Sequence, residues 1–242
     1  MDPKAKIPLM LILRSEELEA KFSDYVLSIG ELRGKKRGVP LKGPTERLLD
    51  KFGYVRLAKL TVKEKETVRK SFWEELEDVM RSIREIEADF IMLMDDAASY
   101  EGPIFPRWFM EELYIPSHQV IAEEIRSRKA EAFLHADGNY GEYFSSLGRI
   151  WDALHPLDIY PRGNIEEYHI WLRRLSNLRH ELECRIATGL PLEIGNEKLI
   201  LTAAREFLRS HGDDGVILSN FHPPLGDLNL ELLLEGLANA LS

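Results

Sequence analysis

A histidine and an aspartate, His135 and Asp137, lie two residues apart at the end of a short apolar run, residues 132–134. Gly138 and Asn139 follow, and such a pair is typical of the turn that ends a strand. In an extended chain, side chains two residues apart leave the same face. An imidazole beside a carboxylate can hold a metal ion or work as an oriented acid/base pair. The spacing therefore predicts a strand that presents one of these sites at its carboxyl end.

Other predicted strands end in side chains of the same kinds. They are Asp95 and Asp96 after residues 90–94, His155 after residues 151–154, and Asn220 and His222 after residues 215–219. Any one of these residues alone is more typical of a turn or a cap. Because the carboxyl ends of parallel strands meet at one rim, we expect these side chains to converge there with His135 and Asp137.

The elements that position these residues alternate between strand and helix. Strands are predicted at 7–13, 39–41, 90–94, 132–137, 151–154, 181–187 and 215–219, and helices at 18–29, 45–52, 62–88, 108–129, 141–147, 165–178, 197–209 and 228–241. Residues 54–60 fit a strand or a connector. This alternation favours a parallel sheet with right-handed crossovers. We predict an α/β, (β/α)8 TIM-barrel-like fold in a single domain, residues 1–242, with a shortened amino-terminal part as an open alternative.

Composition narrows the classes of function. The chain has 242 residues, 44% of them hydrophobic, and a formal net charge of -9. Its basic residues are interspersed with acidic ones apart from a short cluster at 33–37, so we expect no nucleic-acid partner. The single cysteine, Cys184, suits a reducing compartment, and the apolar run at 7–13 is too short to span a bilayer. We therefore expect a soluble, cytoplasmic protein with no membrane partner.

Several segments together resemble the uroporphyrinogen decarboxylase superfamily, which includes the corrinoid-dependent methyltransferases. They are residues 94–103 (MDDAASYEGP), Pro116, residues 134–139 (LHADGN), residues 154–157 (LHPL) and residues 217–223, while residues 43–47 (GPTER) are similar to a loop of the methyltransferase-like branch. The resemblance covers most of the chain from about Gly43 onward. It implies a (β/α)8 barrel with its active site at the rim.

The resemblance implies different roles in the two branches. In the methyltransferases that act on thiols, His135 would match the first residue of a His-x-Cys zinc motif, but Asp137 occupies the cysteine position. In the decarboxylases, Asp96 would stabilise a protonated ring and His222 would donate a hydrogen bond. The arginine-rich segment and the essential aspartate of the decarboxylases lie on their first two strands, and this chain starts too late to match them.

Our leading hypothesis is a methyltransferase-like enzyme with Asp96, His135, Asp137 and His222 as catalytic residues. His135 and Asp137, with His222 or Asp96, would hold zinc or another divalent metal, and a corrinoid would be carried on a partner protein. Asp95, Tyr100, His155 and Asn220 are the predicted contacts to a small-molecule substrate.

Two alternatives stay open. One is a decarboxylase of an acidic, tetrapyrrole-like substrate, for which Arg14, Arg47 and Arg162 are the cationic candidates near the rim. The other is a non-catalytic or regulatory subunit that completes a longer homologue. We also expect a homo-oligomer, because a barrel short of strands exposes sheet edges that another chain can cover.

Overall fold

The computed structural model describes residues 9–12, 20–23, 35–211, 215–221 and 236. Its strands are β1 (Leu9–Ile12), β2 (Ala20–Ser23), β3 (Lys35–Lys42), β4 (Phe90–Met94), β5 (Ala98–Ser99), β6 (Gly102–Pro103), β7 (Glu131–Asp137), β8 (Ala153–Asp158), β9 (Arg185–Leu190) and β10 (Val216–Asn220). Its α-helices are α1 (Pro44–Phe52), α2 (Tyr54–Lys63), α3 (Lys65–Glu85), α4 (Arg107–Phe109), α5 (Ile115–Ser127), α6 (Phe144–Ile150), α7 (Ile165–Arg179) and α8 (Glu197–His211). A π-helical segment, η1 (Met110–Tyr114), and two short 3-10 helices, η2 (Gly141–Tyr143) and η3 (Leu192–Ile194), adjoin them.

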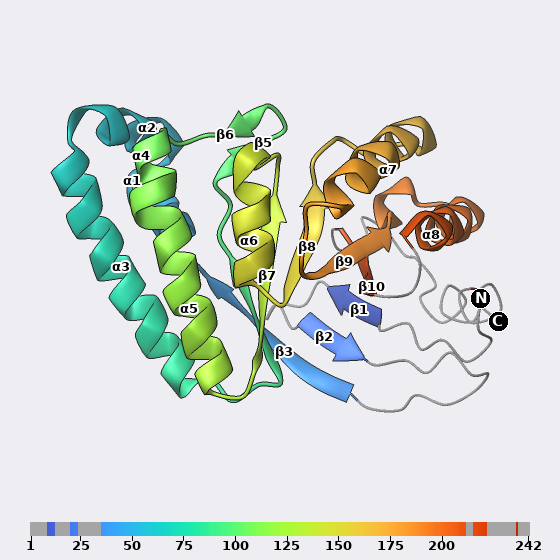
Figure 1. The fold of residues 1–242 in the computed structure, drawn as a ribbon, viewed down its shortest axis with the longest axis horizontal. Coiled ribbons are helices and arrows are strands. Elements are labelled where there is room, and N and C mark those ends of the chain that lie inside the picture. Colours follow the sequence, from blue (N-terminus) through green and yellow to red (C-terminus); the bar gives the residue numbers. More distant parts are fainter. Residues whose placement is uncertain (1–8, 13–19, 24–34, 212–214, 222–235, 237–242) are drawn as a thin grey trace.

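The described strands form a closed barrel in the order β1-β10-β9-β8-β7-β4-β3-β2. The strands from β3 to β10 in this ring pair in parallel, as does β1 with β10, whereas β2 runs antiparallel to both of its neighbours. In Figure 1, α3 and α5 lie together on one flank and α7 and α8 on the other, with strands between them. The expectation of a TIM-barrel-like α/β fold is confirmed.

The apolar strands bury both of their faces. Phe90 and Met92 of β4 belong to the cluster inside the barrel, while Ile91 and Leu93 belong to the larger cluster between strands and helices. Successive side chains alternate across a strand, so a strand covered on both faces reads as a continuous apolar run. The interior cluster consists of Met10, Phe90, Met92, Phe133, Ala153, Ala187 and Ile217. The rim residues continue this inward-facing series beyond the apolar layer.

The amino-terminal region corrects one expectation. The predicted helix at 18–29 is wrong at residues 20–23, which form β2 and pair with both β1 and β3. Pairing with a strand on each side gives this short segment backbone partners, and this tertiary gain outweighs the helical spacing of the sequence. The rest of that predicted helix, and the predicted helix at 228–241, lie outside the described residues.

Some boundaries also differ from the sequence expectations. Residues 54–60 belong to helix α2, and β8 continues beyond residue 154 to Asp158, so that His155 lies within the strand. Strand β9 begins at Arg185 rather than at residue 181. For β8 and β9 the pairing of neighbouring strands sets the limit, and local composition does not record it.

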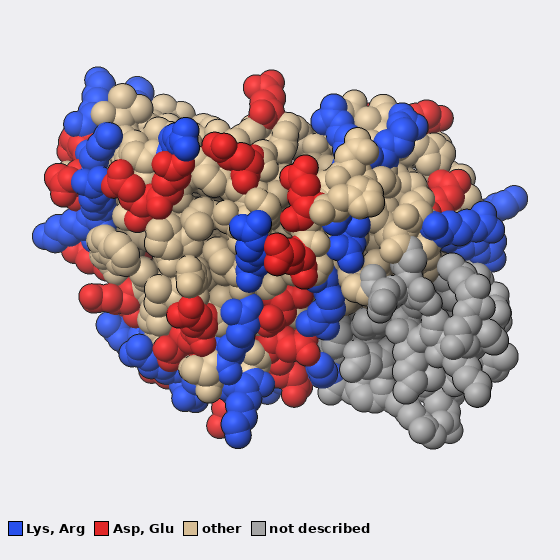
Figure 2. All heavy atoms as spheres, in the orientation of Figure 1, with Lys and Arg blue, Asp and Glu red and all other residues tan. Residues whose placement is uncertain are grey.

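Closure of the ring bears on the argument for self-association. Each barrel strand among the described residues has a partner on both sides, so the described barrel offers no open edge. The argument from exposed edges therefore loses its basis, and homo-oligomerisation itself stays a prediction. No helix among the described residues is both long and apolar enough to cross a membrane. Acidic and basic side chains are interspersed on the face that Figure 2 shows.

The interior packing predicts how sensitive Gly38 is to substitution. A Cβ at Gly38 of β3 would lie 1.9 Å from Cζ of Phe90, inside the barrel. We expect Gly38→Ala to lower the free energy of unfolding by about 1–3 kcal/mol through overpacking. Gly163→Ala is the matched control, because its Cβ would meet only the end of the Glu167 side chain, at 3.4 Å.

Urea unfolding of the two alanine variants measures the difference. The double variant Gly38→Ala/Phe90→Leu should lose less free energy of unfolding than the two single variants lose together, because the smaller leucine side chain removes the clash. Equal stability of the Gly38→Ala and Gly163→Ala proteins would contradict this account of the barrel interior.

Candidate metal centre at the carboxyl ends of the strands

Three predicted site residues converge at the carboxyl ends of β4 and β7. Asp96, His135 and Asp137 each offer one ligand atom, and these atoms all lie within 4.8 Å of one another. His135 pairs with Met94 across the β4–β7 ladder, and Asp96 follows Met94 by two residues, so the alternation of side chains brings both onto the inner face. The structure therefore brings together three of the four residues predicted to be catalytic. The fourth, His222, lies outside the described residues.

His135 is the centre of this group. Its Nε2 lies 3.4 Å from Oδ2 of Asp137, and its Nδ1 lies 3.0 Å from Nδ1 of His155 on the next strand. Nε2 of His155 in turn lies 2.7 Å from the backbone carbonyl oxygen of Asn220 on β10. His155 and Asn220 are fully buried. These two residues were predicted as substrate contacts, but they lie behind His135. Together with His135 they form a series of hydrogen-bond contacts that runs from β7 to β10.

The two carboxylates are also linked. The backbone N–H of Asp137 donates to Oδ1 of Asp96 at 2.9 Å. Burial raises the pKa of Asp96 to about 7, with a smaller opposing effect from His135 and a further upward effect from Asp137. Burial lowers the pKa of His135, but attraction by Asp137, Asp96 and Glu46 outweighs this effect and raises the pKa to about 9. The three side chains therefore form an acidic, partly buried group that favours positive charge.

The loop after β7 is held in place by backbone contacts. Gly138 has a φ of 91°, and a Cβ there would lie 2.6 Å from the backbone of Ala98 in the β5–β6 hairpin. The N–H of Gly138 donates to the carbonyl oxygen of Asp158, and the N–H of Asn139 donates to that of Ser99. A glycine is needed at this close approach. The Gly-Asn pair thus seats the end of β7, and with it Asp137, between the hairpin and β8.

Asp95 occupies a different environment from its neighbour Asp96. Its side chain is fully buried, accepts from the N–H of Glu46 at 2.9 Å and lies 3.0 Å from Nε2 of His118 on α5. A Cβ at Gly43 would lie 2.3 Å from this carboxyl group. Asp95 thus ties α1 and α5 to the end of β4, on the side that faces the helices. Its predicted role as a substrate contact stays a prediction.

Tyr100 lies near a second polar group at the same end of the barrel. Its side chain is partly exposed between β5 and β6, and its hydroxyl donates to Oδ2 of Asp158 at 3.3 Å. The Asp158 carboxylate also pairs with Arg162 at 2.7 Å, and the guanidinium of Arg162 pairs with Glu193 as well. That guanidinium stacks 3.4 Å from the ring centroid of Phe221. Arg162 is therefore already neutralised by two carboxylates.

Asp158 and Glu193 were not singled out from the sequence. A register shift in the β7–β8 ladder places Asp158 opposite Asp137, and Leu157 adopts a φ of 60° at this irregularity. A simple alternation from His155 would have pointed Leu157 inward instead. The sequence does place Asp158 only three positions after His155, which could have marked it as a rim residue. The bulge that turns Asp158 toward the rim is visible only in the fold.

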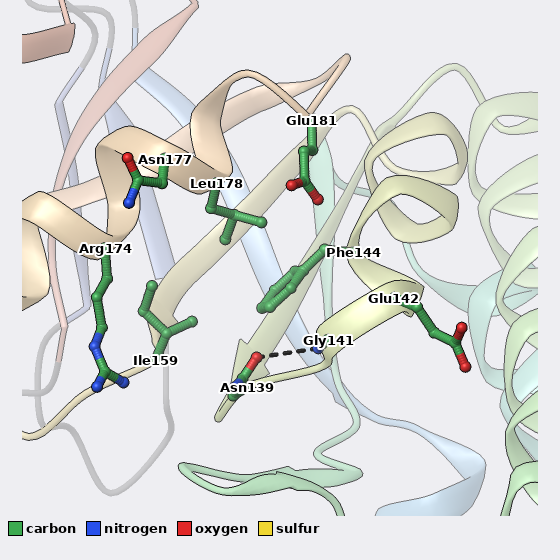
Figure 3. Close-up of a pocket in the computed structure, with 9 residues that line it drawn as sticks. All are labelled: Asn139, Gly141, Glu142, Phe144, Ile159, Arg174, Asn177, Leu178 and Glu181. Atoms are coloured by element: carbon green, nitrogen blue, oxygen red, sulfur yellow. Dashed lines mark hydrogen bonds between the residues drawn. The ribbon is translucent and has the colours of Figure 1, made fainter.

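A pocket of about 450 Å³ lies apart from this group. Figure 3 shows it between α7 and the η2–α6 segment, where Phe144, Ile159 and Leu178 provide an apolar lining. Its polar lining includes Arg174 and Glu181, both exposed to solvent. Because neither Asp96 nor His135 nor Asp137 lines this pocket, it is separate from the candidate centre.

The raised pKa values predict how stability depends on pH in the metal-free protein. In the folded state the pKa of His135 is about 9 and that of Asp96 about 7, whereas the ordinary pKa values of these side chains are 6.5 and 3.8. Each bound proton contributes to the free energy of unfolding. This contribution is complete below the pKa that the side chain has in the unfolded chain, and it is lost as the pH rises through the higher pKa of the folded state. Each unit of pKa difference corresponds to about 1.4 kcal/mol.

We therefore expect the free energy of unfolding to fall between pH 6.5 and about 9, the interval that belongs to His135. Urea unfolding of chelator-treated protein across this range measures the slope. His135→Gln should flatten it, whereas His169→Gln, at a surface histidine that pairs with Glu206, should not. An unchanged slope in His135→Gln would show that the raised pKa is not that of His135.

Comparisons with known proteins found matches among solved structures alone. No family model matches the sequence, and no curated protein matches it. Among solved structures, a B12-independent methionine synthase from Shewanella sp. W3-18-1 matches with 14% identity and a TM-score of 0.48, covering 84% of this chain and 59% of the synthase chain. An uncharacterized protein matches with 15% identity and a TM-score of 0.37, covering 69% of this chain and 44% of that chain. This chain thus spans less than two thirds of the length of either.

Proposed function

We propose that the protein is a metal-dependent methyltransferase whose Asp96, His135 and Asp137 hold a divalent ion at the mouth of the barrel. The observation that carries this proposal is the convergence of two carboxylates and one imidazole within 4.8 Å at the carboxyl ends of β4 and β7. That end of a barrel is where enzymes of this architecture place their chemistry. The methyl-transfer part rests on the sequence resemblance of residues 94–103 and 134–139.

The donor set fits a divalent ion of intermediate or hard character. One imidazole nitrogen and two carboxylate oxygens suit zinc, manganese or ferrous iron, and a thiolate is not needed. Cys184 does not supply one, because it is buried next to β9 and burial raises the pKa of its thiol to about 11. The site therefore departs from a cysteine-rich zinc centre, and we expect an acceptor or donor other than a zinc-bound thiolate.

The residues at this site have different proposed roles. The two carboxylates and His135 would hold the ion, which would act as a Lewis acid on a substrate heteroatom during methyl transfer to or from a corrinoid on a partner protein. Asp96, with its pKa near 7, gives up its proton when a cation takes the proton's place. Tyr100 and Asp158 lie next to this group and are positioned to contact a small-molecule substrate.

The charges around the site argue against the alternative of a decarboxylase for a polycarboxylate substrate. Such a substrate needs cationic partners, and Arg162 is the one buried arginine among the described residues. Its guanidinium is already paired with Asp158 and Glu193. Arg47 bonds to the backbone carbonyl of Lys42 at the surface, and Arg14 lies outside the described residues. The acidic surroundings favour binding of a cation over binding of several carboxylates.

The alternative of a non-catalytic subunit has less support. A subunit that completes a longer homologue needs an open edge to pair with, and the described barrel is closed. A barrel kept only for assembly also gains nothing from two partly buried carboxylates side by side, since removing like charges from water costs stability. This cost is typical of a site retained for chemistry.

Titration of chelator-treated protein with Zn²⁺ and with Mn²⁺ by calorimetry tests the metal site. We expect Asp137→Asn to weaken binding by about tenfold or more, a loss of about 1.4 kcal/mol or more, while the fold stays intact. Asp78→Asn is the control, since Asp78 pairs with Arg81 on the surface of α3. Asp137→Cys should restore zinc binding but not manganese binding, because a thiolate prefers the softer ion.

The methyl-transfer step is tested with methylcobalamin and a panel of small thiols and amines, with its demethylation followed by absorbance. Metal-loaded protein should accelerate demethylation, and Asp137→Asn should remove most of that rate. Tight metal binding without any acceleration would sink the methyl-transfer part and leave the metal site standing. Unchanged metal binding in Asp137→Asn would remove Asp137 from the ligand set.

A further inference from the structure

The contact between the two histidine rings contains a proton whose position can be deduced. Nε2 of His155 lies 2.7 Å from the backbone carbonyl oxygen of Asn220. A carbonyl oxygen only accepts hydrogen bonds, so Nε2 of His155 carries a hydrogen and donates it. This contact fixes one of the two ring nitrogens of His155 as a donor.

The other nitrogen of His155 is then an acceptor. His155 is fully buried, and a second proton would place a positive charge on a ring that has no contact with solvent. A neutral imidazole carries one N–H, so Nδ1 of His155 presents a lone pair. The Nδ1–Nδ1 distance to His135 is 3.0 Å, which requires one hydrogen between the two rings. That hydrogen belongs to His135.

We propose that His155 is a positioning residue, which holds His135 with its Nδ1 protonated so that Nε2 is the atom presented to Asp96 and Asp137. This inference rests on the proposed metal site, since a ring ligates through the nitrogen that its other contact leaves free. His155 acts through His135 and has no contact with the ion. The role differs from the substrate contact predicted for His155 from the sequence.

The arrangement explains why β10 matters to a site built on β4 and β7. The backbone carbonyl of Asn220 belongs to β10, three strands beyond β7 in the ring. It orients His155 on β8, and His155 orients His135 on β7. Because the first member is a backbone group, its position follows from the pairing of β9 with β10 and is insensitive to the side chain of Asn220. The order of the strands thus sets which nitrogen of His135 is available.

The first experiment reads the proton positions directly and needs no metal. Long-range proton–nitrogen correlation spectra of the full chain, with nitrogen-labelled histidine, distinguish protonated from unprotonated ring nitrogens. We expect His155 to show a protonated Nε2 and an unprotonated Nδ1, with His155→Gln used to assign the signals. The reverse pattern on His155 would overturn the inference.

The second experiment measures Zn²⁺ affinity by competition with a chromophoric chelator. His155→Leu should weaken binding by about 10–100-fold at unchanged stoichiometry, the usual cost of losing a partner that orients a ligand. His155→Gln should recover most of the affinity, because its carboxamide can accept from His135 and donate to the Asn220 carbonyl. His169→Leu on the surface is the control.

The outcomes separate this inference from the proposed function. A folded His155→Leu protein with unaltered Zn²⁺ affinity would overturn the positioning role. If His155→Leu does not fold, the positioning role is tested by the Zn²⁺ affinity of His155→Gln and by the spectrum of the unaltered protein. Should the unaltered protein bind neither Zn²⁺ nor Mn²⁺, the proposed function fails, whereas the spectrum of the metal-free chain still accepts or rejects the proton arrangement.

Discussion

Alternation of side chains along paired parallel strands is the constraint on which the site depends. Inside the barrel, Met92, Phe133 and Ala153 form part of an apolar layer on β4, β7 and β8. Two residues further along each strand, the inward positions are held by Met94, His135 and His155, which the ladder register places side by side. The apolar layer closes the barrel below, so the polar layer above it is desolvated on one side. A shift of one residue in any of these ladders would turn its imidazole toward the helices.

Desolvation then determines the electrostatics of the site. Asp96 and Asp137 lie close to one another and to His135, and partial burial makes each ionised carboxylate costly. The result is an acid with a pKa of about 7 beside an imidazole with a pKa of about 9. Such a group is most stable with an added positive charge, carried either by protons or by a metal ion. Binding of a divalent ion and loss of protons are therefore coupled at this site.

Two buried hydrogen-bond systems hold the site from opposite sides. Asp95 ties α1 and α5 to the end of β4 through Glu46 and His118, and so fixes the backbone from which Asp96 projects. The contacts of His155 fix His135 from the side of β10. The neighbouring aspartates Asp95 and Asp96 thus have opposite tasks: one is turned toward the helices and anchors them, and the other is turned toward the barrel axis. Asp95 and Asp96 directly follow β4, and the alternation of side chains along that strand continues into them, which makes this division possible.

The sequence by itself determined the alternation of strands and helices, the apolar strand at residues 90–94, and the grouping of Asp96, His135 and Asp137 at one rim. These follow from short-range patterns, since a run of apolar residues and a two-residue spacing are local properties of the chain. Tertiary structure alone decided that residues 20–23 form a strand, because the strands that pair with them, β1 and β3, lie outside the local sequence. It also decided that Asp158 faces the rim, through a register shift between two strands, and that Asp95 faces the helices. Above all it decided the partners of His155, because a contact with the backbone of Asn220 joins residues 65 positions apart and leaves no trace in local composition.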